Sequence, residues 1–271
     1  MKDKTELESL YNLGASSVIN LTEIEYVPHV LIPHGASLEN LEKLLPSPRR
    51  IKAKPNFTDI NGFCDYIDEF KEDGSRIFID DNKWCFNIVF DCHSFNEIPQ
   101  AGWCDHQATY QTSLAREWTR FKNHHNSKMT QYEFAEFLED NIEYITKPIK
   151  GADLLSMAQD IKIKLKGNIE VEETVAGGMK RLLISDESTI RGTNASKKEI
   201  KFPEKMTLNL RVFKNHSTYP IEVYLRMRRT DEGLKFWITI PDTESFEEQA
   251  FDNIIKDVKE RSGLPTLKGS F

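Results

Sequence analysis

The sequence is poor in cysteine and has no long apolar run, and both features limit the class of protein. No apolar stretch of the chain approaches the roughly 20 residues that a membrane-spanning helix needs. The N-terminal segment MKDKTELESL is charged and lacks the apolar centre of a secretory signal. Four cysteines in a chain of this length are typical of a reducing compartment, although a disulfide between Cys92 and Cys104 is an open alternative. We therefore expect a cytoplasmic protein without membrane association.

The sequence also lacks the short motifs by which many enzymes are identified. It has no G-x-x-x-x-G-K-[ST] phosphate-binding loop and no G-x-S-x-G nucleophile turn. Gly177 and Gly178 stand without the rest of a dinucleotide-binding pattern, and no C-x-x-C or H-E-x-x-H pair occurs. We therefore expect no cofactor. A non-enzymatic role is favoured, and enzymatic activity stays open as an alternative.

What the sequence contains is a mixture of helical and strand patterns that is typical of an α+β fold. The 3.6-residue and two-residue apolar periods are the basis of the assignment. Helices are expected at residues 5–13, 37–45, 58–70, 130–145, 153–166 and 246–261, and strands at 26–33, 76–80, 83–90, 102–111, 180–185, 206–213, 221–229 and 234–240. Thr58 is the expected N-cap of its helix.

These elements predict two halves that share one core. Residues 1–148 form a mixed half with helices on an antiparallel sheet, and residues 149–271 form an antiparallel, strand-rich half closed by a helix. The final segment LPTLKGSF is expected to be loose unless a neighbouring subunit holds it.

A capped amphipathic helix with an acidic face is expected near the middle of the chain. Thr130 and Glu133 have the spacing of a capping box, in which each side chain bonds the other residue's backbone N–H. Four carboxylates fall on the expected solvent side: Glu136, Glu139, Asp140 and Glu143. Such a charge run is commonly a solvated face, and the alternative is a docking surface for a partner protein.

Two triplets of polar residues, Asp91-Cys92-His93 and Cys104-Asp105-His106, flank a short loop between expected antiparallel strands. His93, Cys104 and His106 form a conceivable zinc ligand set, because zinc accepts imidazole nitrogen and thiolate. The same cluster offers candidate catalytic groups if the protein is an enzyme: Asp91, His93, Asp105 and His106. The alternative is a structural cluster whose polar groups bond one another.

Positive charge is unevenly distributed along the chain. Residues 176–235 carry 13 Lys and Arg against 7 Asp and Glu, whereas the whole chain carries 36 against 43. Arg226 and Arg228 share one face of an expected strand, and Arg49 and Arg50 belong to an earlier basic patch. These four arginines are candidates for binding phosphate or an acidic partner, with ordinary solvent exposure as the alternative.

The chain resembles the YfdQ-like family of uncharacterised phage and prophage proteins. The resemblance spans most of the chain and rests on the segments PHG (33–35), LENLE (38–42), PSPRR (46–50), GWCDHQATY (102–110), FAEFLEDN (134–141), LRMRR (225–229) and GLKFW (233–237), with Trp118. It implies a phage-encoded cytoplasmic protein of an infected or lysogenic bacterial host, and it implies no activity. Cys92 stands where this family has an aromatic residue, so Cys92 is a poor candidate for a required ligand.

The leading hypothesis is a non-enzymatic phage accessory protein that acts through a binding surface as a homo-oligomer. Its partner would be a host or phage macromolecule, and inhibition of a host defence system would fit an acidic helix that mimics nucleic-acid phosphate. Oligomerisation is inferred from the apolar strands and the loose tail. Two alternatives stay open: a metal-dependent hydrolase or nuclease using Asp91, His93, Asp105 and His106, and a DNA-binding recombination accessory protein using the arginines.

Overall fold

The computed structural model describes residues 41–271, except residues 96–98, 164–167, 176–178, 186–197 and 232. The chain divides into two units, Met1–Ile51 and Lys52–Phe271. In the first unit the described element is the 3-10 helix η2 (Leu41–Leu44), which lies inside the helix expected at 37–45. The helix expected at 5–13 and the strand expected at 26–33 lie outside the described residues.

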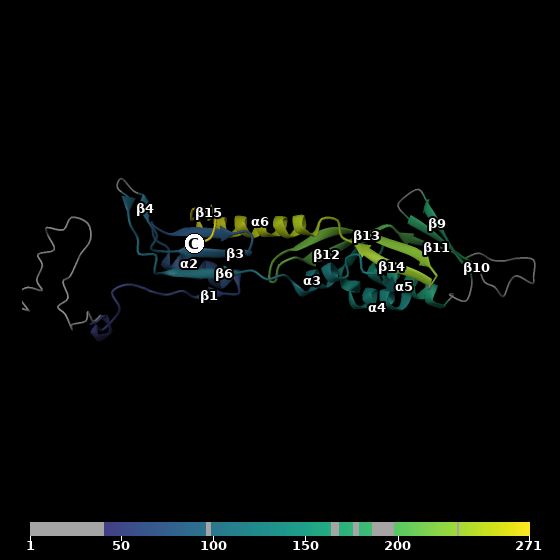
Figure 1. The fold of residues 1–271 in the computed structure, drawn as a ribbon, viewed down its shortest axis with the longest axis horizontal. Helices are drawn as coiled ribbons and strands as arrows, with labels where there is room; N and C mark the ends of the chain where they lie inside the picture. The colour runs from purple at the N-terminus through teal and green to yellow at the C-terminus, as the bar shows by residue number, and fades with distance from the viewer. Residues whose placement is uncertain (1–40, 96–98, 164–167, 176–178, 186–197, 232) are drawn as a thin grey trace, which may run out of the picture. The chain divides into compact units, whose positions relative to one another are not determined.

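The first sheet of the second unit has the order β1-β6-β3-β2-β15 (Figure 1). Its strands are β1 (Asn56–Phe57), β2 (Arg76–Asp80), β3 (Cys85–Val89), β6 (Gln107–Gln111) and β15 (Thr266–Lys268). The three central strands pair antiparallel, and both edge strands pair parallel. Alternate side chains of the central strands are buried, as in Ile77, Phe86 and Tyr110, so one face of this sheet forms core.

Two helices fill the core beside this sheet. The helix α2 (Ile60–Phe70) begins at Asp59, whose carboxylate accepts the backbone N–H groups of Asn61 and Gly62, so the expected cap at Thr58 is wrong by one residue. The helix α6 (Thr243–Ser262) packs against α2 and ends at Gly263, whose φ of 67° suits a residue without a Cβ.

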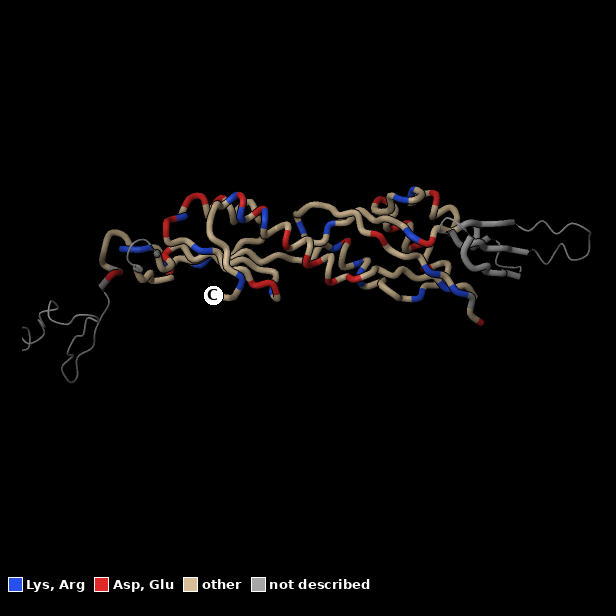
Figure 2. Tube along the Cα trace, turned by 90° about the horizontal axis from the view of Figure 1, so that it is seen from above, with Lys and Arg blue, Asp and Glu red and all other residues tan. Residues whose placement is uncertain are grey.

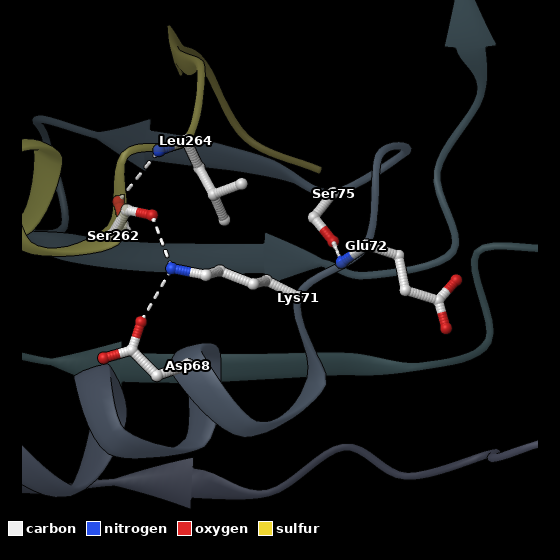
Figure 3. A network of polar contacts seen from close by, with 6 residues as sticks. All are labelled: Asp68, Lys71, Glu72, Ser75, Ser262 and Leu264. Carbon is white, nitrogen blue, oxygen red and sulfur yellow. Dashed lines mark hydrogen bonds and ion pairs between the residues drawn. The ribbon is translucent and has the colours of Figure 1, made fainter.

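The C-terminal segment is held by its own chain, which corrects the expectation of a loose tail. The strand β15 pairs with β2. The turn before it is fixed by the Lys71 ammonium, which donates to the Ser262 carbonyl oxygen (3.2 Å) and to the Asp68 carboxylate (2.8 Å) (Figure 3). The Leu264 backbone N–H donates to the Ser262 hydroxyl oxygen at 3.3 Å. One of the two sequence arguments for oligomerisation is thereby removed.

The second sheet has the order β7-β14-β13-β12-β8 and is antiparallel throughout. Its strands are β7 (Met129–Thr130), β8 (Ile145–Lys147), β12 (Lys205–Arg211), β13 (Thr218–Thr230) and β14 (Gly233–Thr239). The helices beside it are α3 (Arg116–Asn123), α4 (Gln131–Asp140) and α5 (Gly151–Ile163) (Figure 1). The Phe134 and Phe236 rings, 4.7 Å apart and nearly parallel, pack α4 onto this sheet.

The remaining described strands form a three-stranded and a two-stranded sheet. The larger has the order β11-β10-β9, with β9 (Asn168–Val175), β10 (Met179–Ser185) and β11 (Lys198–Pro203), and the smaller pairs β4 (Ser94–Phe95) with β5 (Pro99–Gln100). The helix expected at 130–145 ends at Asp140, and the 3-10 helix η3 (Ile142–Tyr144) follows it.

The α+β class is confirmed, and one cluster of buried apolar residues runs through both large sheets and their helices. Strands from both sides of residue 148 join in the second sheet, where β7 and β8 flank β12 to β14. The division of the chain at residue 148 stays a prediction. Among the described residues, no helix is long and apolar enough to cross a membrane.

Candidate functional site

The two Cys-Asp-His triplets lie just beyond the paired ends of β3 and β6. The antiparallel register puts Val89 opposite Gln107. Beyond this pair, the Phe90 N–H donates to the His106 carbonyl oxygen, and the Cys104 N–H donates to the Asp91 carbonyl oxygen. The expected strand 102–111 starts only at residue 107, because Cys104 has a φ of 59° that interrupts extended backbone. Cys104 and His106 therefore precede the regular strand, and two-residue alternation does not place them on one face.

The Asp91 carboxylate binds the backbone of the second triplet. Its two oxygens accept the backbone N–H groups of Asp105 and His106, each at 3.0 Å. The loop that connects the two triplets also approaches Asp91 closely at Gly102, where a Cβ would overlap the Asp91 carbonyl oxygen. The sequence GWCDH is thus compatible with this geometry because glycine allows the contact and Asp91 satisfies two N–H groups.

The two histidines of the cluster have different surroundings. His106 is 6% exposed, stacks on Phe90 with ring centroids 4.4 Å apart, and has its Nε2 atom 2.8 Å from the Tyr66 hydroxyl. Burial lowers the pKa of His106 below its usual 6.5. His93 is exposed, and its Nδ1 atom accepts the Gly102 backbone N–H at 3.1 Å.

These contacts favour the structural account of the cluster over the metal account. In the part of the chain that the structure describes, no three His, Cys, Asp or Glu side chains are grouped so that they could hold a metal ion. His93, Cys104 and His106 are therefore not brought together as a ligand set. The cluster borders an open cavity of about 420 Å³, whose lining includes Asp91, Cys92 and the 75%-exposed Trp103.

The capping box of α4 is confirmed, and its acidic face is exposed. The Thr130 hydroxyl accepts the Glu133 N–H at 3.3 Å, and the Glu133 carboxylate accepts the Thr130 N–H at 2.6 Å. The predicted carboxylates all point to solvent, namely Glu136, Glu139, Asp140 and Glu143. Glu143 belongs to η3 rather than to α4, so the four residues do not form one helical stripe.

The four predicted arginines fall in different units. Arg49 and Arg50 belong to Met1–Ile51, where the Arg49 N–H lies 3.4 Å from a Glu42 carboxylate oxygen. Arg226 and Arg228 belong to β13 in Lys52–Phe271 and share its solvent-facing side, as the alternation predicted.

The outward side of β12, β13 and β14, called here the outer sheet face, gathers basic and aromatic side chains. The register pairs Lys205 with Tyr224, Arg226 with Trp237, and Arg228 with Lys235 across neighbouring strands. None of these six residues belongs to the buried core. Figure 2 shows Lys and Arg positions interspersed with Asp and Glu positions along the described chain.

The opposite side of the same strands is occupied by core. Its alternate residues are buried, as in Met206, Leu225 and Phe236, and the described helices α3 and α4 contact the sheet there. The amphipathic alternation of β13 and β14 is thus complete, with apolar residues inward and polar, basic and aromatic residues outward.

Contacts on the outer sheet face order its cations. The Arg226 guanidinium carbon lies 4.8 Å and the Lys205 ammonium 5.0 Å from the centroid of the Tyr224 ring. The Glu222 carboxylate accepts a hydrogen bond from Lys205 at 2.7 Å and raises the pKa of that lysine. The sequence analysis missed Lys205, Lys235 and Trp237, although the alternation of β12 and β14 could have placed them on this face.

A second polar depression lies beside the N-terminal half of α6. Its volume is about 560 Å³, and its lining includes Trp84, Lys122 and Glu247. Glu247 is 6% exposed, and one of its oxygens accepts both the Trp118 indole N–H (2.7 Å) and the Lys122 ammonium (2.6 Å). Glu247 therefore fastens α3 to α6, which is a structural role.

Comparison with known proteins gives one match. Residues 2–271 match the model of a family described as an uncharacterized conserved protein family, DUF2303. No curated protein and no solved structure matches the chain. The family match covers nearly the whole sequence, and the chain therefore belongs to the DUF2303 family of uncharacterised conserved proteins.

Proposed function

We propose that this protein is a non-enzymatic binding protein that holds nucleic acid on the outer sheet face. The observation that carries the proposal is the cross-strand arrangement of Arg226, Arg228 and Lys235 on the outward side of β13 and β14. Clustered cations bind the phosphates of nucleic acid, and release of the counterions of the phosphates supplies much of the affinity.

The sign of the charge on this face differs from that of the molecule. The whole chain has a net charge of −7, so general attraction to a polyanion is absent and binding requires a local basic surface. Glu222 is the acidic residue of β13 on this face, and its ion pair with Lys205 offsets its charge. Arg226 and Arg228 then leave an excess of positive charge on β13.

The wider role that we propose is that of a phage-encoded accessory protein, as the likeness to the YfdQ-like family implies. A DNA-binding accessory protein in recombination is one form of this role, and assembly as a homo-oligomer would multiply the number of basic faces. Arg49 and Arg50 supply a further basic patch in the first unit.

A second candidate role uses the acidic face of α4. Glu136, Glu139 and Asp140 are all exposed, so their charges face any approaching partner. Such a face could dock on the nucleic-acid site of a host defence protein, and the contact would weaken with salt because exposed charges are screened. Neutralising Glu136 and Glu139 would then weaken the contact, whereas it would leave the outer sheet face unchanged.

The proposed function is tested by the salt dependence of binding to a labelled oligonucleotide, followed by fluorescence anisotropy. We expect the affinity to fall steeply with salt, and the double charge reversal R226E/R228E to weaken binding strongly and to reduce the salt slope of the remaining binding by about 2. The matched control is K256E/K259E on exposed positions of α6, which changes the net charge equally and leaves the face intact.

Two results would contradict the proposal. One is the absence of binding to any oligonucleotide at low salt. The other is an equal loss of affinity in R226E/R228E and K256E/K259E, because an effect of net charge alone does not identify a site.

A further inference from the structure

We infer that the outer sheet face takes single-stranded nucleic acid, with one base stacked on Trp237 and the adjoining phosphates held by the cations around it. The inference rests on the proposed function and specifies its ligand. It commits to an unpaired strand of DNA or RNA, since both offer the same base faces and phosphates.

Trp237 lies on the outer sheet face rather than in the core. Trp237 lies in the middle of β14 on the outward side, directly opposite Arg226. The inward residues of β14, Leu234, Phe236 and Ile238, already supply the core on the other side. Core packing therefore does not account for a tryptophan at this position.

The contacts of the Trp237 ring differ from those of other tryptophans in the protein. Two other tryptophans are engaged: Trp118 donates to Glu247 at 2.7 Å, and Trp84 packs on Phe251 with centroids 5.0 Å apart. Within the described ranges, the side chain of Trp237 makes no hydrogen bond, ring contact or cation contact with another residue. Trp237 is half-buried, so part of its indole surface is exposed to an aromatic ligand.

Tyr224 has a different role from Trp237 on this face. Its ring is in contact with both Arg226 and Lys205, at 4.8 and 5.0 Å, so it orients the two cations rather than offering a vacant ring. The guanidinium of Arg226 is thereby held on the same face as Trp237 and directly across from it. A stacking residue and an oriented phosphate ligand then stand side by side.

The choice of a single strand follows from base geometry. The faces of the bases are covered by their neighbours in a duplex, and they become available to a tryptophan in an unpaired strand. Sheet surfaces that bind single strands combine cations for the backbone with aromatic rings for the bases. Both components are present on the outer sheet face. The pair of Arg228 and Lys235 lies two residues along the strands from the pair of Arg226 and Trp237.

The test measures anisotropy of the full chain with labelled oligo(dT), oligo(U) and a DNA duplex of equal length. We expect the unpaired strands to bind more tightly than the duplex. The substitution Trp237→Leu should weaken binding of the unpaired strands roughly tenfold or more while it leaves the salt slope unchanged. Trp237→Phe retains a ring and should retain most of the affinity.

The matched control is Trp103→Leu, which removes a 75%-exposed indole outside the face and should leave binding unchanged. Circular dichroism of each variant confirms that it is folded. Equal affinity for duplex and single strand would overturn the inference, and so would wild-type affinity of Trp237→Leu for the unpaired strands. In either case the variant R226E/R228E still tests the proposed function separately. If no nucleic acid binds at low salt, both fail. The relative affinities for oligo(dT) and oligo(U) assign the source as DNA or RNA.

Discussion

At the scale of single residues, two histidines are positioned against tyrosine hydroxyls. The Nε2 atom of His216 lies 2.8 Å from the Tyr110 hydroxyl, and that of His106 lies 2.8 Å from the Tyr66 hydroxyl. Burial lowers the pKa of both imidazoles from the usual 6.5, and burial raises the pKa of Tyr110 to about 12. The native structure therefore favours the neutral forms of these side chains.

The lowered pKa of His216 predicts a loss of stability in acid. As the pH falls through 6.5, the unfolded chain binds a proton at this site before the folded chain does, so the free energy of unfolding decreases. The decrease stops below the folded-state pKa, where both states are protonated. We expect His216→Gln, which keeps an acceptor for Tyr110, to lose less stability between about pH 7 and about pH 5.

Urea unfolding of the wild type and of His216→Gln at several pH values measures this effect. Ser217→Gln is the matched control, since Ser217 is exposed and has no titratable side chain. Identical slopes for the wild type and His216→Gln would show that the imidazole is not held neutral by the fold.

The residues of the Cys-Asp-His cluster show how far the sequence alone could predict a site. The sequence indicated that the triplets would meet, because both flanking strands were recognised. It could not predict that Asp91 would accept two backbone N–H groups, since that depends on the positive φ of Cys104 and the close approach at Gly102. A ligand set and a structural cluster have the same composition, and only the backbone distinguishes them.

At the scale of elements, the start of α4 is defined by its capping box. Thr130→Ala removes the acceptor for the Glu133 N–H, so we expect a decrease of about 1 kcal/mol in the free energy of unfolding. Thr130→Ser keeps a hydroxyl and should remain within a few tenths of a kcal/mol of the wild type. Thermal unfolding monitored by circular dichroism compares the three proteins, and equal stability of Thr130→Ala and the wild type would contradict the role of the cap.

Elements with a clear apolar period were predicted well, whereas the strands β9 and β11 and the very short strands were not. The alternation of β2, β3, β12, β13 and β14 and the helical period of α2 and α6 are each visible within one segment. The strands β1 and β15 contain two and three residues, too few for a period, and exist because a distant strand offers its backbone. Local sequence carries no signal for such pairing.

The same argument explains the error about the C-terminal segment. Its composition is that of a loose tail, and what fixes it is the edge of β2 together with the Lys71 ammonium. An edge strand with unpaired N–H and C=O groups readily accepts another strand. The C-terminal segment covers this edge, so β2 lies inside the sheet rather than at its border.

At the scale of the second unit, the side chain of Phe251 connects elements that lie far apart in the sequence. Its ring lies 5.2 Å from Phe86 of β3 and 6.1 Å from Phe213, which follows β12. Phe251→Ala leaves a cavity between them and should lower the free energy of unfolding by about 3 to 5 kcal/mol. Because both sheets share this contact, amide protection should decrease in β3 and in β12 alike.

Hydrogen exchange followed by mass spectrometry measures the protection of each strand separately. Phe271→Ala, which truncates a ring that is 53% exposed, is the matched control and should have a small effect. A decrease confined to β3, with β12 unaffected, would mean that the two sheets unfold independently. The sequence predicted a shared core, but not the residue that joins its parts.

The late position of α6 and β15 in the sequence has a consequence for synthesis on the ribosome. The strands β1, β2, β3 and β6 emerge early, yet Phe86 gains the cover of α6 only after the segment from Gln111 to Phe251 has been translated. At roughly 5–20 residues per second, that interval lasts on the order of ten seconds. During this time the nascent chain presents an incomplete apolar sheet to chaperones and proteases, and its folding rate is limited by contacts of high sequence separation.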